Sequence, residues 1–123
     1  MKILIVEDNQ LILKVIETKL KKEGYEVINC ENGKEAIERI TDSLPDLVIT
    51  DIMLPYNSGL EIVNFVKEKL QKNIPVIVLS GLGQEKTIEE AFKLGADDYM
   101  TKPFNLSELL MRIKRVSRVF NVA

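Results

Sequence analysis

The sequence of 123 residues is 46% hydrophobic and 29% charged, and its formal net charge is -2. This length and apolar content predict one domain with a single core, and the absence of a basic excess argues against direct binding to nucleic acid. One cysteine, Cys30, and no histidine exclude a disulfide framework within the chain, a Cys/His zinc site and a Ser-His or Cys-His catalytic pair.

The first apolar segment, residues 3–6, contains four residues and is followed directly by Glu7 and Asp8. It is too short for the hydrophobic region of a signal peptide or for a membrane-spanning helix. We therefore expect a cytoplasmic protein that does not contact a membrane.

Short apolar runs rich in β-branched residues recur along the chain and predict strands. They cover residues 3–6, 27–28, 47–49, 76–79 and, with a weaker pattern, 98–100. The first, third and fourth runs are apolar throughout, which is typical of strands buried on both faces of a parallel sheet.

The segments that follow these runs repeat apolar residues with the period of a helix. Three polar residues precede a glutamate at the spacing of a helix N-terminal capping box: Asn32, Ser58 and Asn105. Gly24 and Gly95 occupy positions expected for helix C-caps. The turn at residues 57–59 predicts a positive φ at Gly59, with an ordinary turn as the alternative.

The alternation of strands and helices predicts a doubly wound α/β fold, in which right-handed crossovers place helices on both faces of a parallel sheet. No internal repeat or Pro/Gly-rich linker interrupts the pattern. We expect one domain over residues 1–121, with residues 122–123 as a tail or the start of a trimmed linker.

Polar residues follow the ends of the predicted strands, where ligands bind in open parallel sheets. They are three carboxylates, a hydroxyl and an ammonium: Glu7, Asp8, Asp51, Ser80 and Lys102. Three crowded carboxylates repel one another unless a cation neutralises them, and oxygen ligands favour Mg²⁺ or Mn²⁺. For each acid alone a structural role is the alternative, with Asp8 as a helix cap and Asp51 as a polar strand terminus.

Four segments at these strand ends resemble the signature blocks of bacterial response-regulator receiver domains. They are Val6-Glu7-Asp8-Asn9, Thr50-Asp51-Ile52-Met53-Leu54-Pro55, Leu79-Ser80-Gly81 and Thr101-Lys102-Pro103-Phe104. The resemblance extends from about Lys2 to Phe120. It implies a flavodoxin-like (βα)5 fold with a five-stranded parallel sheet of order 2-1-3-4-5, and a cis peptide bond before Pro103.

The resemblance implies a phosphorylation-controlled switch. Asp51 would accept a phosphoryl group from the phosphohistidine of a histidine kinase or phosphotransfer protein. Mg²⁺ would be held by Asp8, Asp51 and the backbone carbonyl of Met53, while Glu7 would act partly through water. Lys102 would balance a phosphoryl oxygen as a point charge. Such a domain catalyses only its own phosphorylation and dephosphorylation, so we do not expect an enzyme acting on other substrates.

Ser80 and Tyr99 resemble the switch pair of this family, in which the hydroxyl turns toward the phosphoryl group and the aromatic ring moves inward. The alternative for Tyr99 is a residue that anchors the sheet edge by half-burying its ring. Gly81, which follows the switch hydroxyl, is expected to leave the phosphoryl group more open to water or to a phosphatase.

Three stretches near the C-terminus are Gly95-Ala96-Asp97-Asp98-Tyr99, Glu108-Leu109 and Arg112-Ile113-Lys114. They resemble receivers that are joined to a winged-helix DNA-binding domain and dimerise through their fourth helix, fifth strand and fifth helix. The implied intermolecular ion pairs are Asp98 with Arg112 and Asp97 with Arg115. A further pair lacks its basic member, because Ile88 stands where the partner of Glu108 is expected. Ordinary solvated charges are the alternative, since exposed ion pairs are individually weak.

Two outputs stay open: control of transcription through a DNA-binding domain that is absent from these residues, or a stand-alone receiver that docks on a target protein. An aspartate-nucleophile phosphatase is a rival, but Met53 stands two residues after Asp51, where such enzymes place a second acid. A nucleotide-binding module is not expected, because the sequence has no Gly-x-x-x-x-Gly-Lys or Gly-x-Gly-x-x-Gly stretch.

Overall fold

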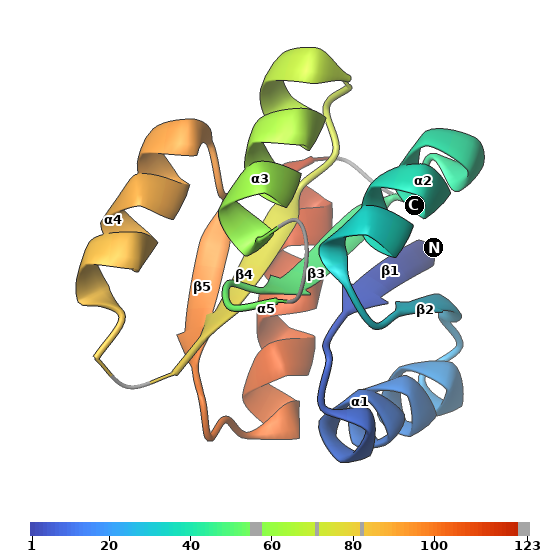
Figure 1. Cartoon of the computed structure of the whole chain (residues 1–123). Coiled ribbons are helices and arrows are strands. Elements are labelled where there is room, and N and C mark those ends of the chain that lie inside the picture. The colour runs from blue at the N-terminus through green and yellow to red at the C-terminus, as the bar shows by residue number, and fades with distance from the viewer. Residues whose placement is uncertain (55–57, 71, 82, 121–123) are drawn as a thin grey trace.

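A computed structural model describes residues 1–54, 58–70, 72–81 and 83–120 (Figure 1). Its five strands pair in parallel in the order β2-β1-β3-β4-β5. They are β1 (Lys2–Val6), β2 (Glu26–Cys30), β3 (Leu47–Asp51), β4 (Val76–Ser80) and β5 (Asp98–Thr101). This order confirms the predicted doubly wound, flavodoxin-like fold. Asn57 of the predicted turn, Asn121 at the end of the predicted domain and the predicted tail at 122–123 lie outside the described residues.

Helices lie on both faces of the sheet, with α2, α3 and α4 on one side and α1 and α5 on the other (Figure 1). They are α1 (Gln10–Lys22), α2 (Gly33–Ser43), α3 (Gly59–Asn64), α4 (Glu85–Leu94) and α5 (Leu106–Val119). A π-helical turn, η1 (Phe65–Lys69), continues α3, and the apolar period of the sequence does not reveal it. Within the described ranges, no helix is long and apolar enough to cross a membrane.

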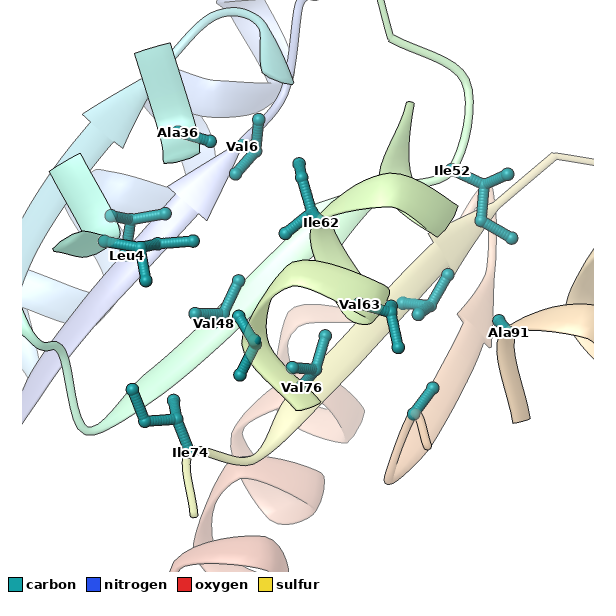
Figure 2. Close-up of a cluster of buried hydrophobic side chains, with 14 of the residues drawn as sticks. Leu4, Val6, Ala36, Val48, Ile52, Ile62, Val63, Ile74, Val76 and Ala91 are labelled. Atoms are coloured by element: carbon teal, nitrogen blue, oxygen red, sulfur yellow. The ribbon is translucent and has the colours of Figure 1, made fainter. Parts of the chain in front are cut away.

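The central strands are buried on both faces, as the uninterrupted apolar runs predict. Every residue of β3 and β4 is buried. On one face Ile62 of α3 packs in a cluster with Val48 and Val76 (Figure 2). On the other face Ile113 of α5 belongs to a second cluster that includes Ile77. Each fully buried side chain of this size contributes roughly 1.5–3 kcal/mol to the free energy of folding. The two clusters therefore stabilise the sheet from both faces.

Polar side chains begin the helices at the predicted positions. Asn32 and Asn105 accept hydrogen bonds from amides in the first turns of α2 and α5, and the reciprocal bonds of a capping box are both present at Ser58. The cap of α1 is Asn9, whose Oδ1 accepts from two amides of the first turn at 3.0 and 3.1 Å. The alternative role of Asp8 as the cap of this helix is therefore wrong.

Gly59 lies where α3 approaches the end of β3 very closely. The predicted positive φ is wrong, because Gly59 is not among the described residues that adopt one. Its amide donates to the carbonyl of Ile52 at 2.9 Å. A Cβ at this position would lie 2.3 Å from the carbonyl oxygen of Asp51 and 2.7 Å from the Cα of Ile52. Glycine is thus required for close packing of backbone on backbone, not for an unusual turn.

The close approach predicts that Gly59→Ala lowers the free energy of unfolding by roughly 1–3 kcal/mol, because the added methyl group must displace main-chain atoms. This loss should exceed the gain of up to about 1 kcal/mol that alanine brings to a helix. Urea denaturation measures the change. In the control, Gly81→Ala, the Cβ would have its nearest neighbour at 3.6 Å, so a change within about 0.5 kcal/mol is expected. Equal stability of the two variants would contradict the packing argument.

Candidate functional site

The carboxyl ends of four strands meet at one edge of the sheet. The parallel register places Glu7, just after β1, level with Asp51 at the end of β3, and it places Ser80 of β4 one residue beyond Asp51. Lys102, just after β5, donates its backbone amide to the carbonyl of Ser80 at 2.6 Å. Residues that are up to 95 positions apart are therefore brought to one site.

Three carboxylates form the acidic part of this site. Glu7, Asp8 and Asp51 each offer an oxygen, and these atoms all lie within 4.8 Å of one another. Glu7 and Asp51 are 0% and 7% exposed, whereas Asp8 is exposed. Carboxylate oxygens are the donors that hard divalent cations prefer, so this group fits a metal ion of that kind.

Lys102 supplies the positive charge of the site. Its Nζ lies 2.5 Å from Oε1 of Glu7 and 2.7 Å from Oδ2 of Asp51. The peptide bond between Lys102 and Pro103 is cis, as the resemblance implied. One ammonium thus bridges the two buried carboxylates, and the third acid, Asp8, is exposed.

Burial and pairing change the acidity of these groups. Burial raises the pKa of Glu7, although the hydrogen bonds from Lys102 and from the Asn9 amide act in the opposite direction. Burial by itself would lower the pKa of Lys102, but its hydrogen bonds to Asp51 and Glu7 outweigh that effect and leave its pKa raised. Lys102 therefore stays a cation at neutral pH.

The second carboxylate oxygen of Asp51 faces the loop that follows β3. Its Oδ1 accepts a hydrogen bond from the backbone amide of Met53 at 3.3 Å. The hydroxyl of Thr50 donates to the backbone carbonyl of Asp51 at 2.9 Å and so holds the strand end from within. The side chain of Met53 is 62% exposed, so this residue contributes main-chain atoms near Asp51 and no acidic group.

The two residues of the predicted switch pair have contrasting environments. Ser80 is 0% exposed, and its Oγ has no hydrogen-bond partner among the described residues. A buried hydroxyl without a partner costs roughly 1–3 kcal/mol, so a new acceptor at the site would relieve an existing penalty. Tyr99 is 39% exposed, and its ring contacts that of Phe92 edge to face, with 5.6 Å between centroids.

The charged residues of the predicted dimer face pair within the chain. Asp98 accepts from Arg112 at 2.7 Å and from Arg115 at 3.0 Å, and Arg112 also contacts Glu108 at 2.9 Å. Within the chain Arg115 thus pairs with Asp98 and not with Asp97. The intermolecular pairs stay a prediction, because these contacts belong to a single chain.

Asp97 has a structural partner that sequence reasoning missed. Its carboxylate lies 2.9 Å from Nζ of Lys67 in η1 and accepts the amide of Val76 at 2.8 Å. Gln84 was also not identified from the sequence. It follows Gly81 by three residues, and in a capping box a side chain at this spacing accepts from the earlier backbone amide. Its Oε1 accepts the Gly81 amide at 2.5 Å.

Solved structures support the same architecture. The response regulator receiver domain from Clostridium thermocellum is 31% identical with a TM-score of 0.92, and the match covers 98% of this chain and 97% of that chain. The receiver domain of Francisella response regulator 1452 is 34% identical with a TM-score of 0.88, over 97% and 98% of the two chains. Chemotaxis protein CheY4 of Vibrio cholerae is 31% identical with a TM-score of 0.86, over 94% and 97%.

Sequence comparison leads to the same family. Response regulator RR06 of Streptococcus pneumoniae serotype 2 (strain D39 / NCTC 7466) is 42% identical over 122 residues, which are 99% of this chain and 55% of that protein. The chain thus spans about half the length of this curated relative. Residues 3–114 match the family model of the response regulator receiver domain. With the sheet order and the strand-end site described above, the chain belongs to the response regulator receiver domain family.

Proposed function

We propose that Asp51 accepts a phosphoryl group from the phosphohistidine of a histidine kinase or phosphotransfer protein. The observation that carries this assignment is the position of its carboxylate. Asp51 ends a central strand, lies within 4.8 Å of two further acids and is paired at 2.7 Å with Lys102. Glu7 is 0% exposed and lies 2.5 Å from the same ammonium, and Asp8 is exposed.

In this reaction a carboxylate oxygen of Asp51 attacks phosphorus and forms a phosphorus–oxygen bond. The bond between phosphorus and the histidine nitrogen breaks, and its electron pair stays on the imidazole. Phosphoryl transfer depends mainly on position and on charge neutralisation. Lys102 remains protonated and balances negative charge on the phosphoryl oxygens, while the buried Ser80 hydroxyl gains the acceptor that it lacks among the described residues.

We further propose a site for Mg²⁺, with Mn²⁺ as a substitute. Asp8, Asp51 and the backbone carbonyl of Met53 would hold the ion, and Glu7 would act partly through water. When bound, the ion would neutralise phosphoryl oxygens as the transfer proceeds. The oxygen-only donor set of the acidic group supports this cofactor.

Phosphorylation is proposed to shift the protein between two conformations through Ser80 and Tyr99. Among the described residues the Ser80 hydroxyl has no hydrogen-bond partner, and Tyr99 is 39% exposed. Both observations support this proposal, because each side chain would gain contacts in a second conformation. We propose control of transcription through a further domain as the output, since the curated relative is about twice the length of the match. Docking of a stand-alone receiver on a target protein is the second candidate.

Catalysis beyond the protein's own phosphorylation and dephosphorylation is not proposed. An aspartate-nucleophile phosphatase requires an acid two residues after its nucleophile, to protonate the leaving group. Here that position is Met53, whose exposed thioether has no proton to donate. Hydrolysis of small phosphate esters is therefore disfavoured by the chemistry of the site.

Incubation with acetyl phosphate and Mg²⁺ tests the acceptor. The wild type should gain the mass of one phosphoryl group, and Asp51→Asn should gain none, because an amide oxygen is not a competent nucleophile. Intact-mass spectrometry measures the difference. Asp42→Asn, at an exposed position in α2, is the matched control and should behave as the wild type. Equal phosphorylation of the Asp51 variant would refute the assignment.

Binding of Mn²⁺, followed by its effect on water proton relaxation, tests the metal site. Asp8→Asn should weaken binding by roughly tenfold or more, because it removes one charged ligand from a small set. Asp42→Asn should leave the affinity unchanged. Similar affinities for wild type and Asp8→Asn would place the metal elsewhere.

Light scattering coupled to size-exclusion chromatography distinguishes the two outputs. Beryllofluoride, which mimics a phosphoryl group on a carboxylate, should double the mass of the wild type in the presence of Mg²⁺ if the α4–β5–α5 face forms a dimer. Asp51→Asn should remain monomeric under the same conditions. A wild type that stays monomeric would favour the stand-alone receiver.

A further inference from the structure

A side chain at the start of α4 bonds to the main chain just after β4. Gly81 is the first residue after β4, and its backbone amide donates to Oε1 of Gln84 at 2.5 Å. Gly83 adopts a positive φ of 81°, a conformation that suits glycine. The carboxamide of Gln84 thus reaches from the start of the helix to the end of the strand.

This reach is different from that of the N-cap side chains of α1, α3 and α5. Asn9, Ser58 and Asn105 use their side chains to accept from amides inside the helix that they begin. Gln84 is the N-cap residue of α4, yet its side chain makes no such bond to the helix. Its acceptor oxygen bonds to the amide after the strand end instead, so the bond joins α4 to β4 and does not cap the first turn of α4.

The Gly81 amide, which Gln84 holds, lies next to residues of the proposed phosphorylation site. It is one peptide bond away from Ser80, whose buried hydroxyl has no partner among the described residues. The carbonyl of Ser80 accepts the amide of Lys102, whose side chain pairs with Asp51. Main-chain amides at such turns are good donors to anionic oxygens, and this one is already occupied by a neutral oxygen of the protein itself.

We propose that Gln84 restrains the unphosphorylated arrangement of the site and so opposes the phosphorylation of Asp51. In the unphosphorylated protein its carboxamide oxygen holds the Gly81 amide, and with it the adjoining Ser80, in the resting arrangement. Adoption of the phosphorylated arrangement requires this bond to open. The inference rests on the proposed function of Asp51, and it adds a residue that acts through Ser80 and Gly81 without touching the phosphoryl group.

Loss of the bond should favour the phosphorylated arrangement. One net hydrogen bond corresponds to about a two- to tenfold change in an equilibrium. Gln84→Met keeps the length of the side chain and removes the acceptor oxygen, so it should lower the half-saturating concentration of beryllofluoride, with Mg²⁺ present, by about this factor. The exchange of the Gly81 amide proton with water, measured by NMR on the unliganded protein, should become faster.

A rescue variant separates this role from a general effect on the helix. Gln84→Glu restores an acceptor oxygen, and combining it with Glu85→Gln keeps the net charge constant. This double variant should have the slow amide exchange and the half-saturation of the wild type. Gln84→Asn, which is one methylene shorter, should resemble Gln84→Met and replaces it if the methionine variant does not fold.

The outcomes distinguish this inference from the function on which it rests. A wild type that takes up neither acetyl phosphate nor beryllofluoride overturns both. If the wild type is modified at Asp51 but Gln84→Met has unchanged half-saturation, only the role of Gln84 fails. It also fails if the charge-balanced double variant shifts as far as Gln84→Met, because the acceptor oxygen would then be irrelevant.

Discussion

The site depends on one ammonium placed between two buried carboxylates. An unpaired carboxylate in such surroundings costs several kcal/mol, and Glu7 and Asp51 have side chains that are only 0% and 9% exposed. Lys102 compensates both at once, and the exposed Asp8 leaves the group open on one side. The arrangement lets three carboxylates lie close together. It also keeps a positive charge beside Asp51, the proposed nucleophile, which would have to meet an anionic phosphoryl group.

The sheet brings Lys102 and the carboxylates together, and contacts of Gly59 and Gln84 constrain the neighbouring strand ends. Parallel strands bring Glu7, Asp51 and Ser80 to one edge because crossovers always return the chain to the same starting side. Gly59 brings α3 directly onto the main chain of Asp51 and removes freedom on one side of it. After the neighbouring strand β4, the side chain of Gln84 holds the amide of Gly81. The contact of Gly59 and the bond from Gln84 thus act on the ends of β3 and β4, which carry Asp51 and Ser80.

The charged residues of the predicted dimer face already have partners within the chain. Asp98 is paired with Arg112 and Arg115 within the chain. Asp97 joins η1 to the start of β4 through Lys67 and the Val76 amide. An intermolecular contact made by these groups would have to share or exchange partners that are already satisfied, so its net gain would be smaller than that of free charges.

The sequence by itself determined the sheet, the strand ends and the acidic group, because apolar runs of β-branched residues and the polar residues after them are local patterns. It could not reveal that Asn9 caps α1 in place of Asp8, since both residues are capping types. Only the tertiary structure decided the roles of Gly59, Gln84 and Lys67. These residues act through contacts with backbone atoms or carboxylates outside their own helices, and such contacts produce no periodic pattern in the sequence.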